Sequence, residues 1–412
     1  MAVISGPVAM APSFHRSGWR SLDWLLLLFV LALSIWSCFA IFSATRPPED
    51  AFVARPASSA SGSSTGTYGS VGQGSLQERL SDPIVKQVAW ILVGVAAIAF
   101  VASFDYQLLM HLQSWIYIIN LGLLMLVLAI GKEVNGAKSW IALGQFRLQP
   151  AELAKVAVIV TLAAFLCRRQ ERIRELPTVL WSLVYLAPPL LLIMKQPDFG
   201  TMLSVLSIWF GMLFFGGARL WHLTTIAAIG VVLFATAWQM NVLKPHQKQR
   251  LAVFLDTNPS PSAMREGGYQ IKQSQIAIGA GQISGQGFGQ GMQNRSKYVP
   301  ENDTDFIFTV VAEELGFIGG AALLMLYLGL LFRSATLAMT TDNYFGVLIA
   351  GGFTSLIAFH TIVNLGMTMR IMPITGVPLP FFSYGGSSYL AFSLCIGLLQ
   401  SVAVRSKRTN AG

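Results

Sequence analysis

The sequence contains ten apolar stretches that are each close to the length of a membrane-spanning helix. A helix needs about 20 apolar residues to cross the hydrocarbon core of a bilayer. Only 11% of the 412 residues are charged and 54% are hydrophobic, whereas a soluble domain carries about 25% charged residues. This pattern excludes an ordinary soluble enzyme, a disordered chain and a nucleic-acid-binding protein. It predicts an all-α polytopic membrane protein. The ten stretches cover residues 24–44, 85–103, 108–130, 151–166, 177–194, 201–215, 223–242, 306–332, 345–365 and 389–404.

The spans define one transmembrane domain over residues 22–404, between tails at 1–21 and 405–412. The first span is too long for a signal peptide and lacks a clean cleavage site, so we interpret it as a retained helix. Three connections stand out. Residues 45–84 are rich in Ser, Gly and Pro and predict a flexible loop, and residues 131–149 predict a polar loop. Residues 243–304 form the longest connection, which favours a functional loop.

An even number of spans places both termini on one side of the membrane. The raw distribution of Lys and Arg does not settle which side, because many of them lie in the long loop, which the positive-inside rule weights poorly. The basic cluster at 168–174 lies in a short turn. It favours termini in the cytoplasm.

Cysteine and histidine give no metal signature. The three cysteines lie in or at the end of apolar runs without a CxxC partner, and the five histidines lack ligand spacing such as HExxH. Packed or interfacial histidines are the favoured interpretation.

Ionisable residues inside the spans are costly and therefore candidates for function. Glu152 and Lys155 are three residues apart, so they share one face of a helix. They form either a structural ion pair or a polar cavity for a charged head group. Glu313 and Glu314 lie two turns into the eighth span, where one of them faces a cavity or both make helix-packing hydrogen bonds. Asp198 precedes the sixth span, and its favoured role is to cap that helix.

Three carboxylates, Glu301, Asp303 and Asp305, lie directly before the eighth span. Asp305 is the last of them and borders the low-dielectric membrane. Such surroundings disfavour the charged form of a carboxylate, which makes it a stronger general base. The alternative is that Thr304 or Asp303 caps the eighth helix and no chemistry occurs there.

The glycine-dense stretch at 279–291 does not follow the GxGxxG pattern and no strand precedes it, so a dinucleotide site is excluded. Its glycines either let backbone amides approach a phosphate or form tight turns.

Seven short motifs between residues 136 and 388 resemble, in order, the SEDS family of bacterial cell-wall polymerases. They occupy residues 136–140, 149–155, 196–201, 249–274, 300–308, 313–316 and 376–388. Two positions depart from the family pattern, which commonly has Ser in place of Ala151 and a basic residue in place of Ser139. The Ser/Gly-rich insert is also longer than in typical members. The residues around Gln249 and Asn302 are more similar to those of the RodA branch, and the FtsW branch stays open.

The resemblance implies a peptidoglycan glycosyltransferase that polymerises lipid II at the outer face of the bacterial inner membrane during cell elongation. It also implies a class B penicillin-binding protein as partner, cytoplasmic termini and an extracytoplasmic long loop. By analogy with the family, Asp305 is the catalytic carboxylate. The candidate substrate-binding residues are Lys138, Trp140, Arg147, Glu152, Lys155, Arg250 and Glu301.

Roles follow from the chemistry of the expected reaction. The four cations among these residues would stabilise the leaving pyrophosphate, Trp140 would stack on a sugar or anchor the loop, and Glu152 would orient Lys155. The sequence identifies no definite cofactor, and a divalent cation such as Mg²⁺ is left open as an additional source of positive charge. Two other classes compete: a flippase for lipid II, which also uses charges between helices, and a scaffold that recruits the transpeptidase.

Overall fold

The computed structural model describes residues 22–45, 82–134, 137–143, 146–240 and 268–409, together with Phe254. The N-terminal tail, most of the Ser/Gly-rich loop and the first part of the long loop lie outside the described residues, as do Arg250 and its neighbours up to residue 253.

A helix lies at each of the ten predicted spans, so the all-α polytopic prediction is confirmed. Eight of them are long and apolar enough to cross a membrane, while α7 and the apolar part of α8, residues 220–233, are shorter. Their bounds are α1 (Trp24–Thr45), α3 (Pro83–Ser103), α4 (Leu108–Ile130), α5 (Pro150–Cys167), α6 (Leu176–Lys195), α7 (Phe199–Phe215), α8 (Leu220–Gln239), α13 (Ile307–Thr340), α14 (Tyr344–Thr368) and α15 (Gly386–Thr409).

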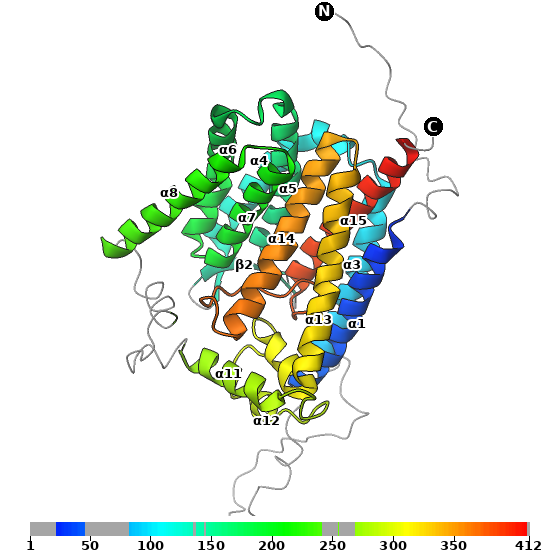
Figure 1. The fold of residues 1–412 in the computed structure, drawn as a ribbon, viewed down its shortest axis with the longest axis vertical. Coiled ribbons are helices and arrows are strands. Elements are labelled where there is room, and N and C mark those ends of the chain that lie inside the picture. The colour runs from blue at the N-terminus through cyan, green and yellow to red at the C-terminus, as the bar shows by residue number, and fades with distance from the viewer. Residues whose placement is uncertain are drawn as a thin grey trace, which may run out of the picture.

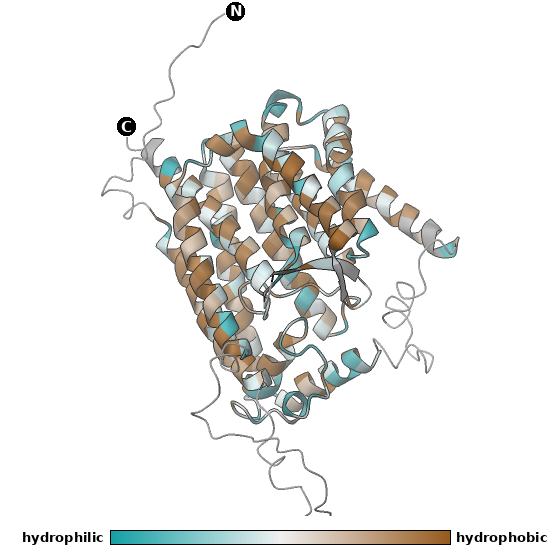
Figure 2. Cartoon of the chain, turned by 180° about the vertical axis from the view of Figure 1, so that it is seen from behind, coloured by the Kyte–Doolittle hydropathy of each residue, from teal (hydrophilic) through white to brown (hydrophobic). Residues whose placement is uncertain are grey.

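The helices form a bundle in which α5, α7, α14 and α15 occupy the centre (Figure 1). Helix α15 packs on α3, α14 packs on α7 and α13, and α1 packs on α13, whereas α8 projects away from the bundle. Hydrophobic residues dominate the long helices, and hydrophilic residues gather toward the ends of the bundle (Figure 2). This distribution is the one expected of helices that cross a bilayer.

The beginning of α1 and the end of α15 lie at the same end of the bundle (Figure 1). The Asp23 main-chain N–H donates to Gln400 Oε1 over 2.9 Å, and the Arg333 guanidinium pairs with the Asp23 carboxylate at 2.6 Å. An even number of spans requires this arrangement.

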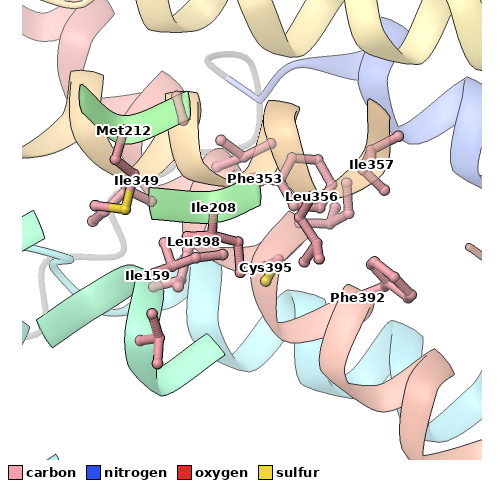
Figure 3. Packing of buried hydrophobic residues seen from close by; sticks show 14 of the residues in the cluster. Ile159, Ile208, Met212, Ile349, Phe353, Leu356, Ile357, Phe392, Cys395 and Leu398 are labelled. Carbon is pink, nitrogen blue, oxygen red and sulfur yellow. The ribbon is translucent and has the colours of Figure 1, made fainter. Parts of the chain in front are cut away.

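The central helices pack through branched and aromatic side chains. Ile159 of α5, Ile208 and Met212 of α7, Ile349 and Phe353 of α14 lie in one contiguous buried cluster with residues of α15 (Figure 3). This core fixes how the ends of α5, α7, α14 and α15 are placed. The polar groups described below are carried on those ends.

The segment predicted as a polar loop at 131–149 contains a small antiparallel sheet. Its strands are β1 (Lys132–Val134), β2 (Ala137–Leu143) and β3 (Phe146–Leu148), in the order β1-β2-β3. Lys132 pairs with Trp140, and Ile141 pairs with Leu148. Aromatic and β-branched residues such as Trp140 and Ile141 favour strands. The prediction of a polar loop gave too much weight to the charged residues of this segment, Lys132, Lys138 and Arg147.

Helix α13 is interrupted at Gly316, whose backbone is left-handed with φ 64°. The predicted span ran through this point without a break. The glycine-rich segment between α11 (Tyr269–Gly281) and α12 (Met292–Arg295) supplies hydrogen-bond partners at the interruption. Gln286 N–H donates to the Glu313 carbonyl over 3.0 Å, and Phe317 N–H donates to the Gln282 carbonyl over 2.8 Å. These hydrogen bonds pair main-chain groups of α13 at the interruption with main-chain groups of the glycine-rich segment. They support the prediction that its glycines form tight turns.

Candidate active site

The loop between α14 and α15 and the segment before α13 are joined by hydrogen bonds. Ser383 Oγ donates to the Thr304 carbonyl over 2.6 Å, and the Tyr384 N–H donates to the Asp303 carbonyl over 2.9 Å. Two motifs that are about eighty residues apart in the sequence therefore form one surface, as Ser383 and Thr304 show. Asp305 follows directly on this surface.

Asp305 is half-buried and lies against the glycine turn of the α14–α15 loop. A Cβ atom built on Gly376 would lie 3.4 Å from Asp305 Oδ2, and Gly376 has φ 69°. Asn364 Nδ2 donates to the main-chain carbonyl of Asp305 over 2.9 Å. The first residue of α13 follows Phe306, and no side chain forms a capping hydrogen bond there. The alternative that Thr304 or Asp303 caps this helix is therefore wrong.

Asp198 caps α7, as predicted. Its carboxylate accepts from the Thr201 N–H and from the Thr201 hydroxyl, each over 2.9 Å, and Gln149 Nε2 donates to its second oxygen over 2.9 Å. Burial raises the pKa of the Asp198 carboxyl, and the hydrogen bonds from Thr201 oppose that shift. A Cβ atom on Gly200 would lie 2.7 Å from the Thr375 carbonyl oxygen. The start of α7 thus packs against the same glycine turn that Asp305 contacts.

Glu152 and Lys155 form a buried ion pair, with Lys155 Nζ 2.7 Å from Glu152 Oε1. The predicted sharing of one helix face is confirmed. Only 1% of Lys155 is exposed, and Nζ lies 3.4 Å from His360 Nε2. His360 Nδ1 lies 2.9 Å from the Pro378 carbonyl, which assigns the imidazole proton to Nδ1. The ion pair is therefore connected to the α14–α15 loop through His360.

The small sheet docks on the beginning of α15. Ser387 Oγ donates to the Arg147 carbonyl over 3.1 Å and accepts from the Gln149 N–H over 3.0 Å. The side chain of Arg147 is exposed and that of Trp140 is half-buried. Burial raises the pKa of the Tyr384 phenol, the charge of Asp303 adds to this shift, and the charge of Arg147 opposes it. Tyr384 therefore lies near both Asp303 and Arg147.

Of the three remaining predicted site residues, Glu301, Lys138 and Arg250, the structure describes the side chain of Glu301 alone. Glu301 is exposed, and its carboxylate accepts from the Thr304 hydroxyl over 3.0 Å. The backbone of Lys138 lies in β2 opposite Glu133, and its side chain lies outside the description, as does Arg250.

The two glutamates of α13 make hydrogen bonds across helices. Glu313 is fully buried and accepts from the main-chain N–H groups of Gln293, over 2.7 Å, and Asn294, over 3.1 Å. The hydroxyl of Ser43 on α1 donates to Glu314. Glu314 also lines a cavity, so each of the two predicted roles is found.

His360, Asn364 and Tyr384 were missed as individual site residues. His360 matches the expectation of a packed histidine, but it contacts a buried lysine, which no local pattern reveals. Tyr384 lies in a motif that the family resemblance had already marked. Among the described residues, no group of three or more His, Cys, Asp or Glu side chains could hold a metal ion. Mg²⁺ is usually held by one or two carboxylates together with substrate phosphates, so this finding concerns only a metal held by protein side chains alone.

Comparisons with known proteins give one consistent result. Residues 71–408 match the family model for FtsW, RodA and SpoVE, described as cell cycle protein. The chain is 38% identical over 296 residues to a probable peptidoglycan glycosyltransferase FtsW from Nitrosococcus halophilus, covering 70% of this chain and 74% of that protein. It is 33% identical over 386 residues to the peptidoglycan glycosyltransferase MrdB of Escherichia coli, covering 94% of each.

The fold is similar to a solved chain from a peptidoglycan synthase complex that coordinates polymerization and crosslinking. The TM-score is 0.72 and the sequence identity 28%, and the match covers 93% of this chain and 98% of the other.

Proposed function

Because this chain belongs to the FtsW, RodA and SpoVE family of cell cycle proteins, we propose that it extends glycan strands from lipid II. It is a peptidoglycan glycosyltransferase, the activity that relatives matching most of its length carry in their names. Lipid II is the undecaprenyl-pyrophosphate-linked disaccharide-pentapeptide that the family resemblance implies. The observation that carries the proposal is the position of Asp305, half-buried on a glycine turn at the beginning of a spanning helix.

The proposed reaction is a single inverting displacement. The 4-hydroxyl of the acceptor sugar attacks the anomeric carbon of the donor, the bond from that carbon to the pyrophosphate oxygen breaks, and its electron pair leaves with undecaprenyl pyrophosphate. A hydroxyl is a weak nucleophile, so a base must take its proton as the new bond forms. Asp305 is that base. Gly376 places no side chain of its own against the carboxylate, and Asn364 Nδ2 donates to the main-chain carbonyl of Asp305.

We propose that Arg147 stabilises the leaving pyrophosphate, because its side chain is exposed and its main chain is hydrogen-bonded to Ser387 at the beginning of α15. Lys138 and Arg250 are proposed to act with it, and Trp140 and Glu301 to contact sugar or peptide. Lys155 is buried and its charge is matched by Glu152. We therefore assign Lys155 and Glu152 to the support of the α14–α15 loop behind the substrate.

The test is polymerisation of fluorescent lipid II by purified protein, read as glycan ladders on a gel. Asp305→Asn should give no ladder, whereas Asp303→Asn, the same change two residues away, should keep most of the activity. Full activity of Asp305→Asn would overturn the assignment of the base. Absence of ladders from the wild type, with translocation of lipid II in vesicles, would instead support a flippase, and absence of both would leave a scaffold.

The partner and the cellular role belong to the same proposal. A class B penicillin-binding protein is the proposed partner, in keeping with the solved synthase complex that this fold resembles. The termini are proposed to be cytoplasmic and the α11–α12 region extracytoplasmic. We assign the chain to elongation, and septal synthesis is the second candidate because an FtsW protein is also a relative. Rescue of rod shape in cells depleted of the elongation polymerase would support the first, and rescue of septation the second.

A further inference from the structure

A cavity of about 360 Å³ lies between α1, α13 and the glycine-rich segment. All but one of its lining side chains are apolar. The lining residues are Trp36, Phe39, Ala40, Phe288, Val310, Val311, Leu315 and the one exception, Glu314. Its lining does not include Asp305 or any residue of the α14–α15 loop. The cavity is formed between two helices that are each long and apolar enough to cross a membrane.

The glycine-rich segment forms one wall of this cavity. Gly287 N–H donates to the Glu314 carbonyl over 3.0 Å, and a side chain on Gly285 would collide with that same carbonyl. Gly287 and Gly289, on either side of Phe288, have φ of 106° and 69°, a region that residues with a Cβ rarely adopt. The wall is therefore held by main-chain hydrogen bonds at the α13 interruption, and it cannot readily collapse into the cavity.

Phe288 lies against the outer part of α1. Its ring centroid is 6.3 Å from that of Phe39, edge to face, and 6.5 Å from that of Phe42, with the rings nearly parallel. About half of each of Phe288 and Phe39 is exposed, 49% and 56% respectively. These two rings form the rim of the cavity.

The rim opens onto the face of α1 that is directed away from the bundle. Leu28, Leu31 and Ile35 are exposed and precede Phe39 at helical spacing, so the four share one face. An exposed apolar stripe along a spanning helix faces lipid chains. The cavity is therefore reached from the hydrocarbon region of the membrane.

The chemistry of the lining selects an apolar occupant. The only charged group is Glu314, which is 3% exposed and accepts from the Ser43 hydroxyl. An anionic head group would be repelled by this carboxylate, and water finds too few polar partners on the other walls. An unfilled apolar cavity of this size also forfeits dispersion contacts on every side.

We propose that this cavity is a binding site for one hydrocarbon chain of a membrane lipid, with Phe288 and Phe39 closing over the chain. The chain comes either from a phospholipid or from a polyprenyl phosphate carrier, which share this chemistry. The proposal does not depend on the assignment of Asp305, because it concerns occupancy of the cavity and not the reaction.

The test is photo-crosslinking of the purified full chain in phosphatidylethanolamine and phosphatidylglycerol nanodiscs. One arm uses a phospholipid with a diazirine on its acyl chain, and the other a polyprenyl phosphate with a diazirine on its isoprenoid chain. Adducts are located by peptide mass spectrometry. We expect adducts on the cavity residues Phe288, Val310 or Val311 in at least one arm, in excess of those on Leu28 and Ile35. The arm that labels identifies the source of the chain.

Ala40→Leu fills the cavity and should abolish the adducts, whereas Ala32→Leu, the same change two turns earlier on α1 and outside the cavity, should leave them unchanged. Where Ala40→Leu does not fold, Phe288→Ala removes the rim without altering α1 and should reduce the adducts sharply. Labelling of the cavity no stronger than that of the Leu28 and Ile35 stripe, or labelling that persists in both cavity variants, would overturn the proposal.

Discussion

Asn364 of α14 holds the main chain of Asp305 with one amide group. Its Nδ2 donates to the Asp305 carbonyl over 2.9 Å and to the Val377 carbonyl over 2.8 Å. The residue is fully buried. One side chain from the central helix thus ties the segment before α13 to the glycine turn of the α14–α15 loop, and these are the two sides of the proposed site.

We predict that Asn364→Leu lowers polymerisation on the order of tenfold to a hundredfold, because misplacing a reacting group by about 1 Å has effects of that size. The loss of the two hydrogen bonds also costs about 0.5–1.5 kcal/mol each in the free energy of unfolding. Initial rates on lipid II at several concentrations separate the effects. The decrease should appear in kcat, since Asn364 is too deeply buried to contact substrate.

Thr361→Val is the matched control on the same helix. Thr361 is also buried, but its hydroxyl has no hydrogen-bond partner among the described residues. This variant should retain both activity and stability. Equal activity of Asn364→Leu and Thr361→Val would show that the bond to Asp305 is not needed.

Gly376→Ala should impair the enzyme without removing any chemical group. Gly376 has φ 69°, where a Cβ is strained by about 1 kcal/mol or more, and the new methyl would lie 3.4 Å from Asp305 Oδ2. We expect a clear loss of polymerisation in the ladder assay together with slightly lower thermal stability. Gly279→Ala in α11 is the control, because a Cβ there meets open space. Activity of Gly376→Ala equal to that of the control would contradict the proposed contact.

Hydropathy was sufficient to predict the fold, because each span is specified by its own composition and does not depend on the rest of the chain. The ten helices lie where the apolar stretches are. The interruption at Gly316 was not predictable in this way. It depends on hydrogen bonds from Gln286 and Gly287 to α13, that is, on a segment about thirty residues earlier, and local apolarity does not change at the break.

The site was predictable in part. The i, i+3 spacing identified the Glu152–Lys155 pair, and the acidic segment before α13 led to Asp305. His360 and Asn364 could not be assigned from the sequence because each acts through a contact with another helix or loop: His360 with Lys155 and Asn364 with Asp305. The family resemblance supplied the motif around Tyr384, but only the structure places Tyr384 beside Asp303.

Breaking the buried ion pair should separate its effect on stability from its effect on activity. Lys155→Met leaves Glu152 as an uncompensated charge, and in the part of the chain that the structure describes Glu152 Oε2 already has no hydrogen-bond partner. Removing one partner of a buried pair costs about 3–5 kcal/mol, so we expect a large decrease in thermal stability. In the double variant Glu152→Gln/Lys155→Met the stability should largely return, since neither charge remains. We expect polymerisation to stay low in the double variant, because the loop behind Asp305 loses its support. Recovery of both properties would show that the α14–α15 loop does not need the pair for activity.

Asp303→Asn should stabilise the protein at neutral pH. Burial raises the pKa of the Asp303 carboxyl, the charge of Glu301 adds to this shift, and the main-chain N–H of Asp303 and the charge of Lys297 oppose it. A carboxyl whose pKa is raised by folding binds its proton more tightly in the folded chain. Its ionisation therefore destabilises the fold as the pH rises from the ordinary Asp value of about 3.9 through the raised value. The amide carries no such penalty.

Unfolding temperatures in detergent should be higher for Asp303→Asn than for the wild type at neutral pH and should converge as the pH falls toward about 4. A wild type that is the more stable of the two at neutral pH would mean that the Asp303 carboxylate makes a favourable contact that outweighs its burial.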